Sequence, residues 1–194
     1  MMKDKVWDSY WLSGRKQFFL HFIRYFQDYL FTKKIKCVKN SRILEAGCGT
    51  GMSLSMLQKK YRVVGFDISK EVVKAARGRC KNVFVADVKK LPFKDRSFDL
   101  IFAQGMLEHF TIEDIKKTVD EMSRISNHVM TTVPRKNGSI DIASRIYKFF
   151  GLKWIFPDEE YYDEDFLTSL LKKYRLKIEN FFFYCFYLIT INSE

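Results

Sequence analysis

The sequence predicts an α/β fold in which a mostly parallel, doubly wound sheet carries helices on both faces. Three observations lead to this prediction. Short apolar runs alternate along the chain with segments of helical periodicity, which is typical of such sheets. A glycine-rich turn, residues 47–51, follows the first apolar run directly, and a later apolar run ends in Asp67. The length of 194 residues fits a single domain with a full core.

The individual elements follow from the same signals. Strands are expected at residues 42–45, 63–66, 83–86, 98–103 and 128–133, and helices at 53–60, 69–79 and 112–125. The helix at 112–125 is the clearest, because Thr111 can cap its start and apolar residues recur along one face. Two further strands are expected at 175–182 and 186–191, although no Gly or Pro marks a turn between them.

Two segments lie outside this alternation. Residues 13–34 have the pattern of an amphipathic helix whose apolar face is aromatic (Phe18, Phe19, Phe22, Phe26 and Tyr29). Residues 138–174 are too long for an ordinary connection between a strand and a helix. They contain expected helices at 142–150 and 164–174, and the acidic run 158–165 fits the capped start of the second, with Asp163 as its N-cap.

Composition excludes several classes of protein. The 47% hydrophobic content excludes a disordered chain, and no apolar stretch reaches the ~20 residues that a spanning helix needs. The four cysteines form no C-x-x-C pair, which favours reduced thiols in a cytoplasmic protein and indicates no zinc site. The net charge of +11 fits a lysine-rich soluble surface better than a nucleic-acid or membrane patch, because no tight basic cluster occurs.

The glycine turn and the acid at the end of the second strand together indicate a nucleoside site. A loop this poor in side chains lets a ligand lie against the backbone, and glycine tolerates the dihedral angles of a sharp strand-to-helix turn. An acid at the tip of the next strand is placed to accept hydrogen bonds from both hydroxyls of a ribose. A dinucleotide fingerprint would place the third glycine at Met52, but here it is Gly51.

With Glu45 ahead of the glycines, the run has the pattern E-x-G-x-G-x-G. This pattern resembles class I S-adenosylmethionine (AdoMet) dependent methyltransferases. The resemblance covers residues 40–134 well and the remainder in outline. It implies a Rossmann-like, seven-stranded sheet whose last strand is antiparallel. It also implies one domain over residues 1–194, divided into an N-terminal helical lid (1–40), a cofactor-binding half (41–134) and an acceptor-side insertion with the last two strands (135–194).

The resemblance also implies cofactor-binding residues, with AdoMet as cofactor and S-adenosylhomocysteine as product. Backbone amides of the glycine turn would approach the amino-acid tail, Glu45 would support that turn, and Gln104 would face the tail. Asp67 would accept both ribose hydroxyls. The adenine would lie among Ile68, Asp87 and Val88. The full implied set is Glu45, Gly47, Cys48, Gly49, Gly51, Asp67, Ile68, Asp87, Val88 and Gln104.

The run Leu107-Glu108-His109 resembles that of quinone-precursor O-methyltransferases. Some enzymes with this run bind a divalent ion through an additional Glu, but Gly105 stands at that position, so no metal is expected. Glu108 and His109 are candidate catalytic residues, and His109 has the ordinary pKa of a general base at neutral pH. An equally open alternative is that both only cap and orient the following helix.

The preferred function is direct in-line methyl transfer to an oxygen, nitrogen or carboxylate of a small molecule. One alternative is methylation of a macromolecule or lipid that the basic, aromatic N-terminal helix contacts. The other is a non-catalytic AdoMet-binding subunit. The sequence names neither the acceptor nor the oligomeric state.

Overall fold

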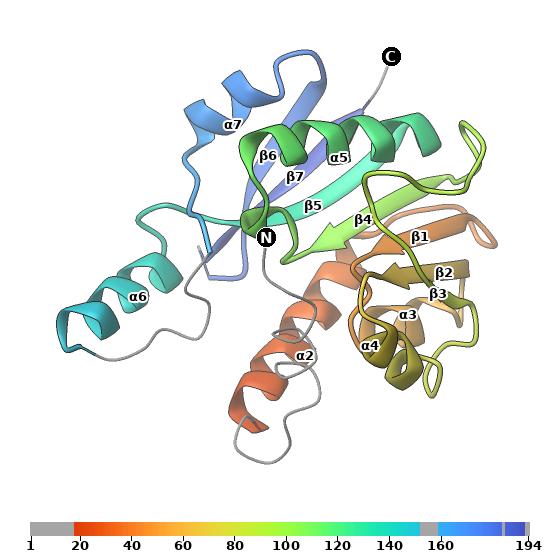
Figure 1. The fold of residues 1–194 in the computed structure, drawn as a ribbon, viewed down its shortest axis with the longest axis horizontal. Coiled ribbons are helices and arrows are strands. Elements are labelled where there is room, and N and C mark those ends of the chain that lie inside the picture. The colour runs from red at the N-terminus through yellow and green to blue at the C-terminus, as the bar shows by residue number, and fades with distance from the viewer. Residues whose placement is uncertain (1–17, 152–158, 184, 193–194) are drawn as a thin grey trace.

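A seven-stranded sheet with helices on both faces makes up the described part of the chain (Figure 1). The structure is a computed structural model that describes residues 18–151, 159–183 and 185–192, with side chains from residue 24 onward. The strand order is β3-β2-β1-β4-β5-β7-β6, and β7 runs antiparallel to both of its neighbours. The predicted fold class, including the antiparallel last strand, is therefore confirmed.

The strands agree with the predicted ranges to within two residues. They are β1 (Arg42–Ala46), β2 (Arg62–Asp67), β3 (Val83–Val85), β4 (Leu100–Gln104), β5 (His128–Pro134), β6 (Arg175–Phe181) and β7 (Phe186–Asn192). The central strands β1 and β4 are buried along almost their whole length. Helices cover both faces there, and this burial is why these strands are continuous apolar runs in the sequence.

The helical elements are α2 (Phe18–Lys34), α3 (Met52–Leu57), α4 (Lys70–Ala76), the 3₁₀ turn η2 (Leu107–His109), α5 (Ile112–Ile125), α6 (Ser139–Phe149) and α7 (Glu164–Leu170). Two predicted N-caps are confirmed: Thr111 accepts from the Asp114 amide, and Asp163 accepts from the Phe166 amide. Helix α6 begins three residues earlier than predicted. The carboxylate of Asp141 accepts from the Asn137 amide at 2.7 Å and so satisfies a donor at the helix start.

Each face of the sheet has its own apolar core. Helices α5 and α7 cover one face, where Val119, Met122 and Leu167 pack against β1, β4, β5 and β7. Helices α2, α3 and α4 cover the other face (Figure 1). The doubly wound arrangement leaves the carboxyl ends of β1, β2 and β4 at a common edge, which is where open α/β sheets bind ligands.

The second half of α2 is part of the core. We expected the N-terminal helix to cover the site rather than to build the core, and the structure corrects this for the described half. Phe31 is fully buried, with its ring 5.3 Å from Phe102 and 6.1 Å from Phe181. The first part of the expected lid, residues 1–17, and the side chains of Phe18, Phe19 and Phe22 lie outside the described residues.

The turn between β6 and β7 explains why no boundary was visible in the sequence. Phe182 and Phe183 both have left-handed backbone conformations, with φ of 51° and 54°. This region normally selects Gly or Asn, and bulky residues adopt it only at a cost in conformational energy. The turn therefore contains no Gly or Asn at these two positions, and these are the residues from which a turn is usually predicted.

Gly65 fixes how closely the glycine turn approaches β2. A Cβ at this position would lie 2.4 Å from Leu54 Cδ1 and 3.0 Å from Cys48 Cβ. Leu54 belongs to α3 and Cys48 to the glycine turn, so both elements press on the backbone of β2 at one point. A side chain at Gly65 would move the turn.

We therefore predict that Gly65→Ala lowers the free energy of unfolding by roughly 1–3 kcal/mol, the usual cost of overpacking a core. Equilibrium urea unfolding measures this. Gly78→Ala is the matched control, because a Cβ there meets only the Ala75 carbonyl at 3.3 Å. The control is expected to change stability by less than about 0.5 kcal/mol. Equal stability of Gly65→Ala and the wild type would show that Leu54 and Cys48 do not pack this closely on the backbone of β2.

Candidate active site

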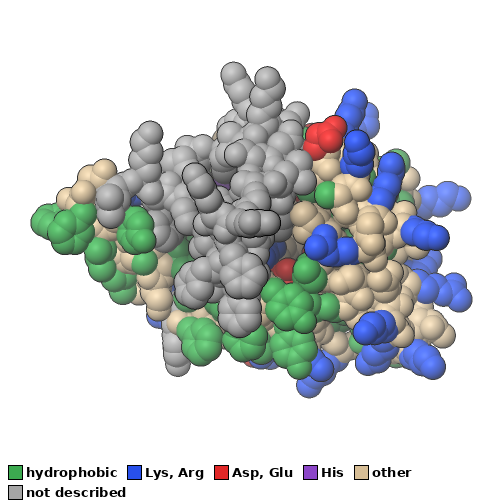
Figure 2. Space-filling view, turned by 90° about the horizontal axis from the view of Figure 1, so that it is seen from below, with side chains coloured by type: hydrophobic (Ala, Val, Ile, Leu, Met, Phe, Trp, Pro, Cys, Tyr) green, Lys and Arg blue, Asp and Glu red, His purple; other side chains and the backbone are tan. Residues whose placement is uncertain are grey.

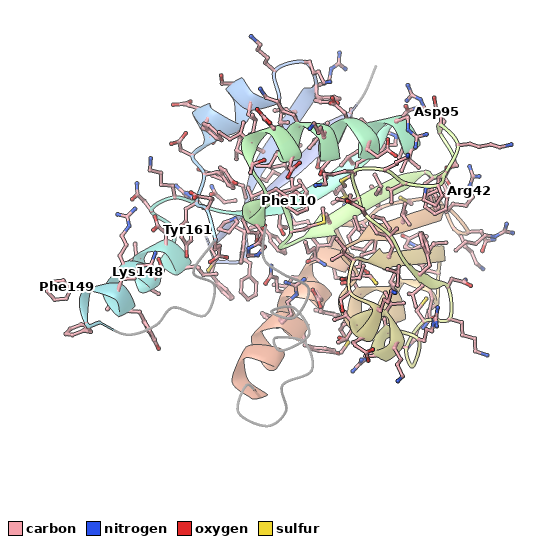
Figure 3. All side chains as sticks on the ribbon, in the orientation of Figure 1. Arg42, Asp95, Phe110, Lys148, Phe149 and Tyr161 are labelled. Carbon is pink, nitrogen blue, oxygen red and sulfur yellow. The ribbon has the colours of Figure 1, made fainter. Side chains whose placement is uncertain are left out.

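The predicted site residues meet at the carboxyl edge of the sheet. The glycine turn follows β1, Asp67 ends β2, and Gln104 ends β4. Phe110, just after η2, lies near this edge, whereas Arg42 and Asp95 mark the opposite edge of the sheet (Figure 3). The topology thus brings together side chains that are up to about 60 positions apart in sequence.

The glycine turn has the backbone conformation that its sequence predicts. Gly47, Gly49 and Gly51 have φ of 66°, 51° and 77°, in the left-handed region that favours glycine. The turn is also held in place, because the Cys48 amide donates to the Phe66 carbonyl at 2.8 Å. Helix α3, which follows, has only six residues. The turn therefore offers a bare backbone surface, with little contribution from a helix dipole.

Asp67 joins the glycine turn to the end of β2. Its Oδ2 accepts from the Gly49 amide at 3.1 Å, and its Oδ1 accepts from the Ser69 amide at 3.0 Å. The carboxylate is almost fully buried, so these two amides fix its orientation. A carboxylate can accept about four hydrogen bonds in total. Asp67 can therefore hold the turn and also accept from a ligand.

The three residues expected around an adenine lie beside Asp67 but differ in exposure. Ile68 follows it directly and is 43% exposed. Asp87 is exposed, and its Oδ1 accepts from the Lys89 amide, so it shapes the turn after β3. The side chain of Val88 is buried in the core, which leaves its backbone as the group that can face a ligand.

A buried polar cluster lies under the glycine turn, made of Arg24 and Asp28 from α2, Glu45 from β1, Ser53 from α3 and Gln104 from β4. Arg24 Nε donates to Asp28 Oδ1 at 3.1 Å, and its Nη2 donates to the Gln104 carbonyl at 3.3 Å. Burial raises the pKa of Asp28, against the opposing effect of Arg24. Burial, and then the neighbouring Asp28 charge, raise the pKa of Glu45 well above its ordinary value.

Two buried oxygen atoms of this cluster accept no hydrogen bond from the described residues. Gln104 Nε2 donates to Ser53 Oγ at 3.0 Å, but Gln104 Oε1 and Glu45 Oε2 are buried with no hydrogen-bond partner among the described residues. Buried polar atoms are normally paired, so such atoms need an explanation. Two acceptors beside a bare backbone turn fit a ligand that brings its own donors, such as an ammonium group.

Glu108 and His109 lie in η2, and neither caps the following helix. Thr111 is the N-cap of α5, and Asp114 supplies the amide that it binds. The expectation that these two residues cap α5 is therefore wrong, whereas a part in orienting the helix stays a prediction. They differ in exposure, since Glu108 is fully buried and His109 only partly.

The carboxyl group of Glu108 lies over the end of β4. A Cβ on Gly105 would meet Arg24 Nη1 at 3.0 Å and Glu108 Oε1 at 3.5 Å, so both groups crowd the same backbone position. Burial, followed by the charge of Glu159, raises the pKa of Glu108 to about 8. Its Oε2 has no partner among the described residues. Burial thus favours the protonated form of Glu108.

An aromatic segment closes the other side of Glu108. The Glu160 amide donates to the Glu108 carbonyl at 3.1 Å and ties residues 159–162 to η2. Tyr161 donates to Glu159 Oε2 at 2.9 Å, and the buried Tyr162 stacks on Phe166 with centroids 5.7 Å apart. The predicted acceptor-side insertion thus brings tyrosines and a carboxylate beside η2.

Arg24 and Asp28 are the functional candidates that sequence reasoning missed. Two charges four residues apart interrupt an otherwise aromatic helix, and this spacing places them on one face. That signal was available, but nothing in the sequence indicated that this face meets the glycine turn.

Across the described residues, no group of three or more His, Cys, Asp or Glu side chains is arranged to hold a metal ion.

Comparison with known proteins finds similarity to methyltransferases. Residues 43–128 match the family model of a methyltransferase domain. A probable tRNA methyltransferase 9B of Mus musculus is 34% identical over 44% of this chain and 19% of its own length. A malonyl-[acyl-carrier protein] O-methyltransferase of Hamiltonella defensa is 31% identical over 68% of this chain and 49% of its own length. This chain therefore spans half or less of the length of these two relatives.

A solved structure from Thermotoga maritima, described as a SAM-dependent methyltransferase and possible histamine N-methyltransferase, has the same fold. Its TM-score is 0.76 at 16% identity, over 98% of this chain and 99% of that one. The matched residues 43–128 contain the glycine turn, Asp67, Asp87 and the run at 107–109. The chain is thus similar to a methyltransferase domain over residues 43–128 and has the fold of a SAM-dependent methyltransferase.

Proposed function

We propose that the protein is an AdoMet-dependent methyltransferase that transfers a methyl group directly to a small-molecule acceptor. The observation that carries the proposal is the double attachment of Asp67. Its carboxylate holds the left-handed glycine turn through Gly49 and faces the same edge as the buried polar cluster. Ribose and amino-acid recognition would then be adjacent, as AdoMet requires.

The residues present fit each part of AdoMet, which supplies a methyl group on a positively charged sulfur. The glycine turn would lie along the amino-acid tail. Glu45 and Gln104 have buried oxygens that can accept from its ammonium group. Arg24, which already donates to the Gln104 carbonyl, would face its carboxylate. Asp67 would accept the ribose hydroxyls.

The adenine would lie between Ile68 and the turn that follows β3. The exposed side chain of Ile68 would cover one face of the ring. Asp87 would accept from the exocyclic amino group while keeping its bond to the Lys89 amide. The Val88 amide would donate to a ring nitrogen.

On the acceptor side, Glu108 is the better candidate than His109 for taking a proton. In the transfer, a lone pair on the acceptor attacks the methyl carbon, the carbon–sulfur bond breaks, and its electron pair stays on sulfur. Any proton on the attacking atom must then leave. Glu108 is buried near the edge where the acceptor approaches and has a pKa of about 8, close to the working pH of a general base.

Two alternatives remain in different classes. Methylation of a macromolecule is supported by the tRNA methyltransferase relative, although this chain spans only 19% of that protein's length. A non-catalytic AdoMet-binding subunit is disfavoured by the intact set of glycines and acids, since a protein freed from catalysis would not need a buried titrating Glu108. Localisation in the cytoplasm stays a prediction of the sequence.

The ribose role of Asp67 is tested by substitution. Asp67→Ala is expected to weaken AdoMet binding by roughly 1.5–3 kcal/mol, because it removes hydrogen bonds to a charged group. Isothermal titration calorimetry with AdoMet, S-adenosylhomocysteine and NAD measures this. Glu71→Ala, on the exposed side of α4, is the matched control and should bind as the wild type does. Preferential binding of NAD, or unchanged AdoMet affinity in Asp67→Ala, would contradict the proposal.

The role of Glu108 is tested by pH. The folded state keeps the Glu108 proton up to about pH 8, whereas the unfolded chain loses it near the ordinary value of 4.5. Stability of the wild type should therefore fall as pH rises from about 4.5 to about 8. Glu108→Gln removes this penalty and should raise the free energy of unfolding at pH 8 by on the order of 2 kcal/mol.

The same variant should lose transfer activity while gaining stability. In the wild type, kcat/KM is expected to rise through about pH 8, as Glu108 becomes able to accept a proton. Glu108→Gln should lack this rise, and His109→Ala should keep it. A rise that persists in Glu108→Gln and disappears in His109→Ala would assign the proton transfer to His109 instead.

A further inference from the structure

Two hollows in the surface adjoin at Tyr61, which lines both of them. One, of about 760 Å³, lies between α2 with the segment after it and the end of α3. The other, of about 590 Å³, lies between the start of β2 and the segment that joins α4 to β3. We call the two together the basic groove. Its cationic lining residues are Lys33, Lys36, Lys59, Lys60, Arg62, Arg77, Arg79 and Lys81.

The positive charge of the groove is not neutralised within the described residues. All eight cationic side chains are exposed, and no Asp or Glu lines either hollow. None of the eight forms an ion pair with another described residue. Arg79 donates to the Thr50 carbonyl at 3.1 Å, but that partner is neutral. Like charges gathered on one surface repel each other, and a partner with several negative charges would relieve this repulsion.

The fold brings these cations together from three separate segments, 33–36, 59–62 and 77–81. For this reason the sequence shows no tight basic cluster. The Gln58 side chain donates to the Arg79 carbonyl at 2.9 Å, and the Tyr61 hydroxyl donates to the Ile35 carbonyl at 3.5 Å. These bonds join the second segment to the third and to the first. Figure 2, seen from the side of α2, α3 and α4, shows Lys and Arg gathered at one end, with little Asp or Glu between them.

Exposed tyrosines form part of the α2 wall of the groove. Tyr25 and Tyr29 line the larger hollow and are 47% and 41% exposed. Lys33 is one helical turn further along the same face, and its Nζ lies 5.1 Å from the centroid of the Tyr29 ring. Aromatic faces beside cations are the surface on which single-stranded nucleic acids bind, because bases stack on the rings while phosphates contact the cations.

The shape of the groove and its apolar residues favour a nucleic acid strand over a bilayer. Binding in the plane of a bilayer requires apolar side chains that protrude from the basic surface. Ile35, Leu57 and Val63 are instead buried in the walls, and among the aliphatic lining residues Val38 alone is largely exposed. A flexible strand can follow two adjoining hollows, whereas a flat bilayer would touch only their rims.

We propose that the basic groove binds single-stranded nucleic acid, with phosphates on its cations and bases stacked on Tyr25 and Tyr29. Arg62 begins β2, and residues 77–81 precede β3, so this part of the groove lies at the amino ends of the strands. The candidate site lies at their carboxyl ends and shares no residue with the groove lining. The proposal therefore goes beyond the proposed methyl transfer and does not depend on it.

The test is fluorescence anisotropy of the full chain, without AdoMet, with labelled oligouridine and oligothymidine of about 20 nucleotides, longer than a usual single-strand site. Both strands should bind, more weakly as salt rises. Lys36→Gln/Lys60→Gln/Arg77→Gln removes one cation from each of the three segments. It should weaken binding at least about tenfold at low salt and reduce the slope of log K against log salt by about 2, because each phosphate contact contributes about 0.7.

The matched control removes the same charge from the other face of the sheet. Lys116→Gln/Lys117→Gln/Lys172→Gln changes three exposed cations in α5 and just after α7, and it should bind as the wild type does. Stacking is tested separately. Tyr25→Ala/Tyr29→Ala should weaken binding at least about fivefold without changing the salt slope, whereas Tyr25→Phe/Tyr29→Phe keeps both rings and should keep the affinity.

Equal losses in the two triple variants would overturn the proposal, because net charge alone would then explain the binding. Unchanged affinity of Tyr25→Ala/Tyr29→Ala, together with equal binding of inorganic polyphosphate, would overturn it in favour of a general polyanion surface. Binding to vesicles of phosphatidylcholine with phosphatidylglycerol, without binding to either strand, would assign the groove to a membrane instead. AdoMet titrations of the same variants should match the wild type and report on the proposed function separately.

Discussion

The close seating of the glycine turn on β2 is the constraint on which the rest of the site depends. Gly65 lets Cys48 and Leu54 approach the strand, and Asp67, two residues later, accepts the Gly49 amide. The same carboxylate therefore sets the shape of the turn and offers acceptors to a ligand. Because one group does both, the spacing between turn and acid is fixed by the fold, and the proposed ribose and amino-acid sites would be held together before any ligand arrives.

Beneath that turn the protein keeps polar groups that a fold alone would not favour. Glu45 and Asp28 are buried together, and a single guanidinium, that of Arg24, lies between Asp28 and the end of β4. Glu108 is buried as well and has a raised pKa. Buried carboxyl groups with partial compensation destabilise a domain, and the proposed ligand binding and proton transfer would account for their presence. The N-terminal helix α2 contributes to both the core and the candidate site. Its Phe31 is buried in the core, and its Arg24 donates to the carbonyl of Gln104 at the site.

The sequence predicted most of the fold and the meeting of the glycine turn, Asp67 and Gln104 at one edge of the sheet, because those signals are local. The apolar runs, the three glycines and Asp67 lie within short windows, and their chemistry is specific. The contributions of Arg24 and Asp28 could not be predicted, because they depend on which face of α2 meets β1 and β4. The β6–β7 turn could not be predicted either, because its local sequence is misleading. Phe182 and Phe183 adopt a backbone conformation that their residue type disfavours.

The central claim, that the Asp67-anchored turn is the AdoMet site, is tested most directly by hydrogen exchange of backbone amides. Mass spectrometry of the full chain with and without S-adenosylhomocysteine would report each segment separately. Slower exchange is expected in segments 45–51, 67–69 and 85–89 and in the second half of α2, with little change along α6. Protection confined to other segments, or none at saturating ligand, would contradict it.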